Sequence, residues 1–347
     1  MNFGGRGTID FMEIKIGNVT IPAPLIALAP MAGTSTVTFR GICHGLGSSY
    51  APTELVSARS IVYNGTEKSF RYLEIDPEHE GVTCIQLFGN EPEDFKVAIE
   101  AICNDPRLQA VDIIDVNMGC PVPKVVKTGA GSALTKDPVL AGKIMETVRA
   151  TAEKHGKAAT VKTRIGFNDN MRNGPEFAKV LAESGAQAIC VHGRTASQMY
   201  RGTADINAIA QMREAVKDTG VVFIANGDIT DGESAKRMLG VTKADGLMIG
   251  RASMGDPWIF NRVRHYLNED VIPVSPSPKD KCDMLLNELV GTASHVGEPT
   301  AVKEMRSVMP HYIKGLPGSA VIKTQLCLAS TIDEVKKILE DSIKLWE

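Results

Sequence analysis

A chain of 347 residues with 43% hydrophobic and 23% charged residues has an ordinary globular composition and is long enough to bury a sizeable core. Its formal net charge of −3 argues against a protein whose whole surface binds nucleic acid. No apolar run approaches the roughly 18 residues that span a bilayer, and the first residues lack the apolar stretch of a signal peptide, so we expect a cytoplasmic protein without membrane attachment.

The first residues, 1–11, are rich in glycine and are expected to be a tag or an upstream extension. Residues 13–21, EIKIGNVTI, form two short alternating stretches around Gly17 and Asn18. Such a glycine-containing pair between alternating stretches favours a tight turn, so this segment predicts a small hairpin ahead of the main fold.

Eight short apolar runs follow, and several, such as VDIIDV and VVFIA, are nearly continuous in apolar residues. Runs of this kind are typical of parallel strands that are buried on both faces. We predict strands at Leu25–Ala29, Ser49–Pro52, Val82–Phe88, Val111–Val116, Ala159–Thr163, Ala188–Val191, Val221–Ala225 and Gly246–Ile249.

Helix signals lie between these runs. Asp137 and Pro138 open an amphipathic stretch with an N-cap residue and a proline at the first helical position. Glu91 and Pro92 begin another, with acidic residues in its first turn. Strand–helix alternation repeated eight times over about 250 residues is typical of a (β/α)8 TIM barrel, which we place over residues 12–270.

A doubly wound α/β sheet is the alternative fold. That fold needs a glycine-rich turn after its first strand. Here the first strand leads into Pro30-Met31-Ala32-Gly33, which is not a G-x-G-x-x-G turn, so the sequence favours the barrel.

The composition changes after the last predicted strand and its helix. Residues 271–280, VIPVSPSPKD, are rich in proline and serine and predict a linker. Beyond them, residues 281–296 and 333–346 have the pattern of amphipathic helices. We therefore expect a small C-terminal helical domain over residues 280–347, packed on the barrel.

The polar residues of the barrel gather where its strands end. In a TIM barrel the reaction site is expected at the C-terminal ends of the strands, formed by the loops that follow them. One such residue alone has a structural explanation, but seven coincident positions on one rim predict a functional site. They are Pro30-Met31-Ala32, Gln86, Asn117 with Cys120, Lys162 with Arg164, His192, Asn226-Gly227-Asp228 and Gly250-Arg251.

The last two strand ends predict a phosphate site. Glycines at 227 and 250 leave backbone N–H groups open to a phosphate, at the place where this fold repeatedly binds one. Arg251 adds a cation with a bidentate fork. A cofactor anchored there would extend over the barrel mouth, where Gln86, Lys162 and His192 could bond a polar ring.

Seven strings of the sequence then carry a family resemblance. In order along the chain they resemble the signature set of the tRNA dihydrouridine synthases, most closely the bacterial B-type branch, over residues 25–260 and more weakly through the tail. The string around NMGCP is the most specific of them. The seven strings are LAPMAG, QLFG, DVNMGCPVPKVVKTGAGSALTKDP, VKTR, VHGRT, VFIANGDIT and LMIGRASMGDPWIF. The GR after the last strand is their least specific part.

The resemblance implies a flavin enzyme that reduces uridine in tRNA to 5,6-dihydrouridine. It implies that FMN is the bound cofactor, that NADPH re-reduces it, and that tRNA and a nicotinamide nucleotide are the partners. By position, it implies that Asn117 and Arg164 grip the target uracil and that Cys120 donates a proton. It implies that the flavin is bordered or held by Pro30, Met31, Ala32, Gln86, Lys162, His192, Asn226, Gly227, Asp228, Gly250 and Arg251.

Cys120 is the one cysteine whose context indicates chemistry. The seven cysteines contain no C-x-x-C pair and no zinc-like spacing with histidine, so we expect reduced thiols and no metal site. Reduction of the uracil double bond needs a hydride at C6 and a proton at C5 from the opposite face. A thiol with a pKa near 8.5 is mostly protonated at neutral pH and can supply that proton.

Two basic stretches are compatible with RNA despite the acidic total. Between 117 and 136 there are lysines at 124, 127 and 136 and no acidic residue. Between 303 and 323 four basic residues face one acidic residue. In that second stretch Pro310 interrupts what family members continue as a helix, which is a departure from the family pattern.

Three rival functions stay open at the level of sequence. Another FMN barrel, a dehydrogenase of a free pyrimidine base, would share the phosphate site, although the basic loop after Cys120 and the helical tail favour a macromolecular substrate. An aldolase that forms a Schiff base through Lys162 would leave Gln86 and the NMGCP string unexplained. A non-catalytic RNA-binding barrel would not need Cys120, Lys162 and His192 together.

Overall fold

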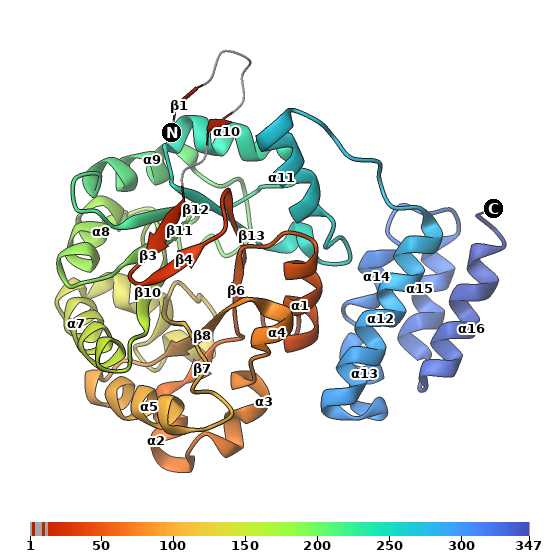
Figure 1. The fold of residues 1–347 in the computed structure, drawn as a ribbon, viewed down its shortest axis with the longest axis horizontal. Helices are drawn as coiled ribbons and strands as arrows, with labels where there is room; N and C mark the ends of the chain where they lie inside the picture. Colours follow the sequence, from red (N-terminus) through yellow and green to blue (C-terminus); the bar gives the residue numbers. More distant parts are fainter. Residues whose placement is uncertain (1, 4–8, 11–12, 347) are drawn as a thin grey trace.

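The computed structural model describes residues 2–3, 9–10 and 13–346. The expected tag or upstream extension at residues 1–11 lies largely outside this range. Of those residues, β1 (Asn2–Phe3) pairs antiparallel with β2 (Ile9–Asp10). Figure 1 shows a barrel of strands ringed by helices, with a bundle of C-terminal helices at its side. The predicted (β/α)8 TIM barrel with C-terminal helices is confirmed.

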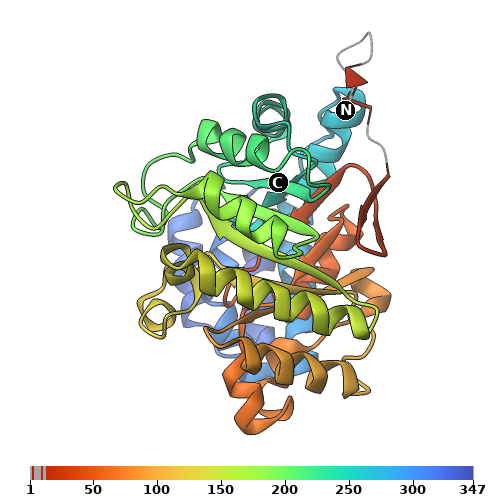
Figure 2. The same ribbon diagram turned by 90° about the vertical axis from the view of Figure 1, so that its left-hand side faces the viewer.

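The predicted hairpin is present as β3 (Ile14–Ile16) and β4 (Val19–Ile21), paired antiparallel. Gly17 turns the chain with a positive φ of 62°, which favours glycine, and a Cβ there would come within 2.4 Å of the end of the Gln187 side chain. Ile16 and Ile21 are fully buried and belong to the same core cluster as the inner side chains of the strands. The hairpin therefore closes the N-terminal end of the barrel (Figure 2).

Eight parallel strands form the barrel in the order β5-β13-β12-β11-β10-β9-β8-β6, with the short β7 (Val56–Ser57) extending the β6 side. The backbone N–H of Ser49 donates to the carbonyl of Ile26 at 2.7 Å, which joins the β6 side to β5. The strands are β5 (Leu25–Leu28), β6 (Tyr50–Pro52), β8 (Val82–Phe88), β9 (Ile113–Met118), β10 (Ala158–Arg164), β11 (Ala188–His192), β12 (Val222–Asn226) and β13 (Gly246–Ile249).

All eight predicted strands are present, and the main difference lies at their C-terminal ends. The strands at β9, β10, β11 and β12 continue one or two residues beyond the prediction, into Met118, Arg164, His192 and Asn226. Parallel pairing holds these polar ends in register, for example His192 beside Asn226. Polar residues that the sequence placed after the strands are therefore partly strand residues.

Helices cover the outside of the barrel, and the N-cap predicted at Asp137 is found. Asp137 accepts a hydrogen bond from the Leu140 N–H at 3.0 Å at the start of α7. The helices up to the last strand are α1 (Val37–Gly45), α2 (Ala58–Asn64), α3 (Phe70–Leu73), α4 (Pro77–Glu80), α5 (Pro92–Asn104), α6 (Pro123–Val126), α7 (Pro138–Lys154), α8 (Gly174–Glu183), α9 (Ile206–Ala215) and α10 (Gly232–Thr242), with 3-10 turns η1 (Glu67–Ser69) and η2 (Gly131–Lys136).

After β13 the chain forms the turn η3 (Arg251–Ser253) and then α11 (Ile259–Glu269), and residues 271–277 follow without helix or strand. The tail helices pack around a core cluster of their own. Pro310 lies in the first turn of a short helix that is separate from the one before it. These helices are α12 (Pro278–Val296), α13 (Glu298–Met305), α14 (Met309–Tyr312), α15 (Ser319–Leu328) and α16 (Ile332–Ile343).

The tail contacts the barrel through α12, which packs on α1 (Figure 1). A Cβ on Gly291 would lie 2.6 Å from the Thr38 side chain, so glycine permits this close approach. Nδ1 of His295 lies 3.0 Å from a carboxylate oxygen of Glu74 across the same seam. No helix in the described part of the chain is long and apolar enough to cross a membrane.

Candidate active site

A cavity of about 420 Å³ opens at the C-terminal ends of the strands. This volume lies within the roughly 300–1,000 Å³ typical of pockets for small molecules and cofactors. All but one of the residues predicted for the site line it, and the exception is Gln86. The lining includes Pro30, Met31, Ala32, Asn117, Cys120, Lys162, Arg164, His192, Asn226, Gly227, Asp228, Gly250 and Arg251.

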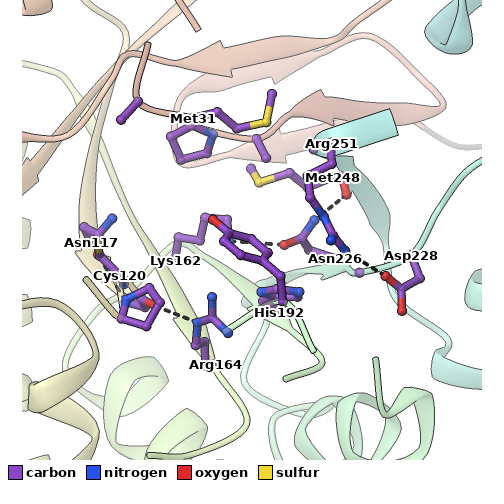
Figure 3. Close-up of a pocket in the computed structure, with 18 of the residues that line it drawn as sticks. Met31, Asn117, Cys120, Lys162, Arg164, His192, Asn226, Asp228, Met248 and Arg251 are labelled. Atoms are coloured by element: carbon purple, nitrogen blue, oxygen red, sulfur yellow. Dashed lines mark hydrogen bonds and ion pairs between the residues drawn. The ribbon is translucent and has the colours of Figure 1, made fainter. Parts of the chain in front are cut away.

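Strand register is what brings these side chains together. Lys162 on β10 pairs with Asn117 on β9, and two residues further along Arg164 pairs with His192 on β11. His192 in turn pairs with Asn226 on β12. Because side chains two residues apart on a strand point to the same side, Lys162 and Arg164 both face the cavity (Figure 3).

One wall of the cavity is apolar. It consists of Ala29, Pro30 and Met31 after β5, with Met248 from the neighbouring strand β13. Figure 3 shows Met31 on the opposite side of the cavity from Lys162 and His192. The space between an apolar wall and a set of nitrogen donors suits a flat ring with a polar edge.

The far end of the cavity has the features of a phosphate site. Gly227 has a φ of 134°, and a Cβ there would lie 2.6 Å from the Ala204 Cβ, so the chain needs glycine at this position. Gly250 and Arg251 follow the adjacent strand β13 and line the same end. The Arg251 side chain is about half exposed, so its guanidinium is accessible to an anion.

Asp228 is not free to repel an anion, because it is paired with Arg194. The Arg194 guanidinium donates to both carboxylate oxygens, at 2.9 and 2.8 Å, and Arg251 donates to one of them at 3.2 Å. Burial raises the pKa of Asp228, but the hydrogen bonds from Arg194 and from the Ala204 N–H, together with the charges of Arg194 and Arg251, hold the pKa below its usual value. Arg194 is itself buried. The sequence placed it two residues after His192, in the VHGRT string, but gave it no role in the site.

His192 is a neutral imidazole with a defined tautomer. Burial, together with the charges of Lys162 and Arg164, holds its pKa well below the usual range. Nη1 of Arg194 lies 3.3 Å from Nε2 of His192. Because a guanidinium only donates, Nε2 must accept, and the ring proton is then on Nδ1. The site thus contains an imidazole N–H donor that does not carry a charge.

Lys162 is held against Asn226. Its Nζ donates to Oδ1 of Asn226 at 3.2 Å, while Nδ2 of Asn226 donates to the carbonyl of Met248 at 2.7 Å. Burial lowers the pKa of Lys162 from its usual value. The ammonium group is therefore positioned by the strands themselves and not by a flexible loop.

Cys120 lies on the loop after β9, partly accessible at the cavity wall. Its backbone N–H donates to Oδ1 of Asn117 at 2.9 Å. Nε of Arg164 donates to the carbonyl of Gly119 at 2.7 Å. Burial raises the pKa of the Cys120 thiol, although the Val122 N–H and the charge of Arg164 act against it, so the thiol carries its proton at neutral pH.

Gln86 is fully buried below the cavity wall. Its Nε2 donates to Asp115 at 2.6 Å, and its Oε1 accepts from Nδ2 of Asn117 at 2.8 Å. Its bond to a bound ring stays a prediction. Asp115 was not selected from the sequence, yet a charged residue inside the apolar run VDIIDV was a usable signal.

Tyr200 is a further lining residue that the strand-end pattern did not indicate, because it lies in the loop after β11. Its side chain is 56% exposed, and the Arg251 guanidinium lies 5.0 Å from its ring centre. Nothing in a loop sequence of mixed polarity distinguishes such a tyrosine from an ordinary surface residue.

The cavity residues fit a phosphorylated flavin. The space has the volume of a cofactor pocket, an apolar wall, nitrogen donors opposite that wall, and a glycine turn beside an accessible arginine at one end. The carboxylate at that end is neutralised by Arg194. No described group of three or more His, Cys, Asp or Glu residues is placed to hold a metal ion.

Comparison with known proteins gives a consistent result. A family model described as dihydrouridine synthase (Dus) matches residues 27–345. The probable tRNA-dihydrouridine synthase of Rickettsia conorii is 38% identical over 88% of this chain and 89% of its own length. tRNA-dihydrouridine synthase B of Pseudomonas aeruginosa is 36% identical over 90% of both chains. A solved variant of NCR from Zymomonas mobilis has a TM-score of 0.53 at 15% identity, covering 78% of this chain and 97% of its own, which is a likeness of fold alone.

Proposed function

Because the chain belongs to the dihydrouridine synthase family, we propose that it reduces specific uridines of tRNA to 5,6-dihydrouridine, with bound FMN and with NADPH as the reductant. The observation that carries the proposal is the position of Cys120. Cys120 has a protonated thiol and lines the cavity wall, and its backbone N–H is fixed by a hydrogen bond to Asn117. An uncharged acid at this place suits the addition of a proton to carbon.

Reduction of the uracil ring adds two hydrogens across one double bond. When bound and reduced, FMN supplies the hydride for C6. Cys120 holds the proton for C5 on its Sγ and becomes a thiolate when it gives that proton up. Arg164 and Lys162, whose charges favour the thiolate, then stabilise the charge that develops on sulfur.

The residues that would hold FMN follow from the geometry. Gly227, Gly250 and Arg251 would bind the phosphate, and the ring would lie along Pro30, Met31 and Ala32. Lys162 Nζ and the Nδ1–H of His192 would donate to its polar edge, and Asn226 keeps Lys162 in place. The bond from Gln86 to the ring stays a prediction, because the two ends of its carboxamide are bonded to Asp115 and Asn117.

The target base would enter from the open side of the cavity. Asn117 and Arg164 border Cys120 there, and the exposed ring of Tyr200 offers a flat surface for an unstacked base. A uridine inside folded RNA must leave its stack to reach this depth, as base-modifying enzymes require. The helical tail over residues 280–347 is proposed as the part that holds the rest of the tRNA.

The purified protein tests this proposal directly. We expect it to be yellow and to release FMN, not FAD, on denaturation. After reduction with NADPH in the absence of oxygen, it should convert uridine to dihydrouridine in an unmodified tRNA transcript, and tRNA from a deletion strain should lack dihydrouridine at the same positions. The proposal would be contradicted by a colourless protein that takes up no FMN. It would also be contradicted by a reduced enzyme that leaves the transcript unchanged and reduces free uracil instead.

A further inference from the structure

A chain of buried polar side chains runs below the cavity wall toward Cys120. Asp115 accepts from Nε2 of Gln86 and from Oγ1 of Thr160, both at 2.6 Å. Oε1 of Gln86 accepts from Nδ2 of Asn117 at 2.8 Å. Oδ1 of Asn117 then accepts the backbone N–H groups of Gly119 at 3.2 Å and Cys120 at 2.9 Å.

The barrel itself builds the lower part of this chain. Gln86 on β8 is in register with Asp115 on β9, and Asp115 is in register with Thr160 on β10. All three side chains are at most 4% exposed. Buried polar groups of this kind are costly unless each finds a partner, and here each does.

The direction of the hydrogen bonds is fixed at both ends. The backbone N–H groups of Gly119 and Cys120 can only donate, so Asn117 must turn its carbonyl oxygen toward them. An ionised Asp115 can only accept, so Gln86 must turn its amide nitrogen toward it. The two carboxamides between these ends then have one consistent orientation each, and a flip of either places donor against donor or acceptor against acceptor.

From this we infer that Asp115 is a positioning residue for Cys120. It acts through Gln86 and Asn117, whose oriented oxygen anchors the backbone on which the Cys120 thiol is carried. The inference rests on the proposed function in one respect, which is that Cys120 supplies the proton. Asp115 does not line the cavity and takes no part in the chemistry itself.

Two substitutions at 115 separate the direction of the hydrogen bonds from the charge. Asp115→Asn can still present an oxygen to Gln86, while its amide nitrogen faces the Thr160 hydroxyl, which can accept. Asp115→Ala removes the acceptor and leaves Gln86 free to rotate. Asp112→Ala is the matched control, because Asp112 accepts from Thr83 between the same two strands at the opposite end of the barrel.

The first readout is hydrogen exchange at the amides of Gly119 and Cys120 in the FMN-bound enzyme, which does not depend on turnover. We expect Asp115→Ala to accelerate this exchange at least tenfold, and Asp115→Asn and Asp112→Ala to leave it within about threefold of wild type. The second readout is single-turnover dihydrouridine formation by pre-reduced enzyme, which should fall at least tenfold in Asp115→Ala alone. Flavin reduction by NADPH should stay within about twofold in all variants.

Unchanged amide exchange in Asp115→Ala would overturn the inference, as would equal impairment of Asp115→Asn, which would assign the effect to charge. If Asp115→Ala does not fold, Gln86→Met removes the middle of the chain and should accelerate exchange at the same two amides; this comparison is made on the FMN-free protein, because Gln86 is itself a predicted contact of the ring. If the wild-type enzyme forms no dihydrouridine, the proposed function has failed, and the exchange experiment still decides whether Asp115 positions the Cys120 backbone.

Discussion

At the scale of single residues, the thiol of Cys120 is distinguished from the other buried cysteines by where it lies. Cys84 and Cys190 are enclosed in the barrel interior, and burial raises their pKa values too, yet neither lines the cavity. Cys120 borders the cavity and lies within the electrostatic reach of Arg164 and Lys162. A protonated thiol becomes an acid catalyst only when a substrate atom can reach it, and of these three cysteines only Cys120 borders the cavity.

We therefore expect Cys120→Ala to keep FMN and its reduction by NADPH but to lose the proton transfer. General acids typically contribute about 10²–10⁴-fold, and we expect a loss of this size in single-turnover dihydrouridine formation. Cys103→Ala, at a half-buried cysteine on α5 away from the cavity, is the control and should react like wild type. A Cys120→Ala enzyme that reacts at the wild-type rate would mean that another group supplies the proton.

Arg251 is an accessible cation at the end of the cavity that we propose binds the phosphate. Arg251→Ala should weaken FMN binding by about 1.5–3 kcal/mol, the usual contribution of a hydrogen bond to a charged group. Equilibrium binding of FMN, followed by flavin fluorescence, measures this loss. Arg201→Ala is the control, because Arg201 lies in the loop of Tyr200 but does not line the cavity. Equal FMN affinity in wild type and Arg251→Ala would place the phosphate elsewhere.

The sequence predicted which residues would meet but not how they would be paired. The alternation of strands with helices, together with the polar residues at the strand ends, was enough to predict that Asn117, Lys162 and His192 lie on one rim. Asp228 was assigned to the phosphate, yet its carboxylate is bonded by Arg194. Such pairings depend on side-chain directions across neighbouring strands, which no pattern along one strand encodes.

At the scale of elements, the strand ends were the least predictable boundaries. The predicted strands stopped before Arg164, His192 and Asn226, because a polar residue after an apolar run was taken as the end of the strand. The backbone continues to pair there because neighbouring parallel strands are still in register. This continuation makes the site rigid, since its side chains extend from hydrogen-bonded strands.

The contact of α12 with α14 contains a buried acid, and this predicts a pH dependence of stability. The Tyr312 hydroxyl donates to Glu288, and burial raises the pKa of Glu288 to about 7. An unfolded glutamate has a pKa near 4.3, so between these values the folded protein binds a proton that the unfolded chain releases. The free energy of unfolding therefore falls as pH rises through this window, on the order of 3 kcal/mol in total.

Glu288→Gln removes that titration while its carbonyl oxygen can still accept from Tyr312. We expect this variant to gain stability relative to wild type as pH rises from about 5 to 8, measured by urea denaturation at each pH. Glu340→Gln, on the exposed side of α16, provides the comparison and should follow the wild-type curve in parallel. Parallel curves for Glu288→Gln would show that Glu288 does not titrate differently in the folded state.

At the scale of the whole molecule, the formal charge of −3 conceals a local arrangement that suits RNA. Lys124 and Lys127 are exposed in and directly after the short helix α6, which follows Cys120 and lies next to the cavity. In the tail, Lys314 is exposed and Lys323 partly so, and both act electrostatically on His311, so the three gather in one place. The two basic groups belong to the barrel rim and to the tail respectively, as a substrate larger than one nucleotide would require.

If the tail lysines bind phosphates, tRNA affinity should fall steeply with salt, with a slope of roughly −0.7 to −0.9 for each neutralised phosphate. Lys314→Glu combined with Lys323→Glu should weaken tRNA binding and flatten that slope by about one for each phosphate that is no longer neutralised, without changing FMN content. Lys143→Glu with Lys154→Glu, on the exposed face of α7, makes the same change of charge on the barrel exterior. Because that pair lies away from the tail, it should lower affinity less and keep the wild-type slope. Equal effects of the two double variants would mean that the enzyme senses only net charge, and the tail would then lose its assignment as the part that holds tRNA.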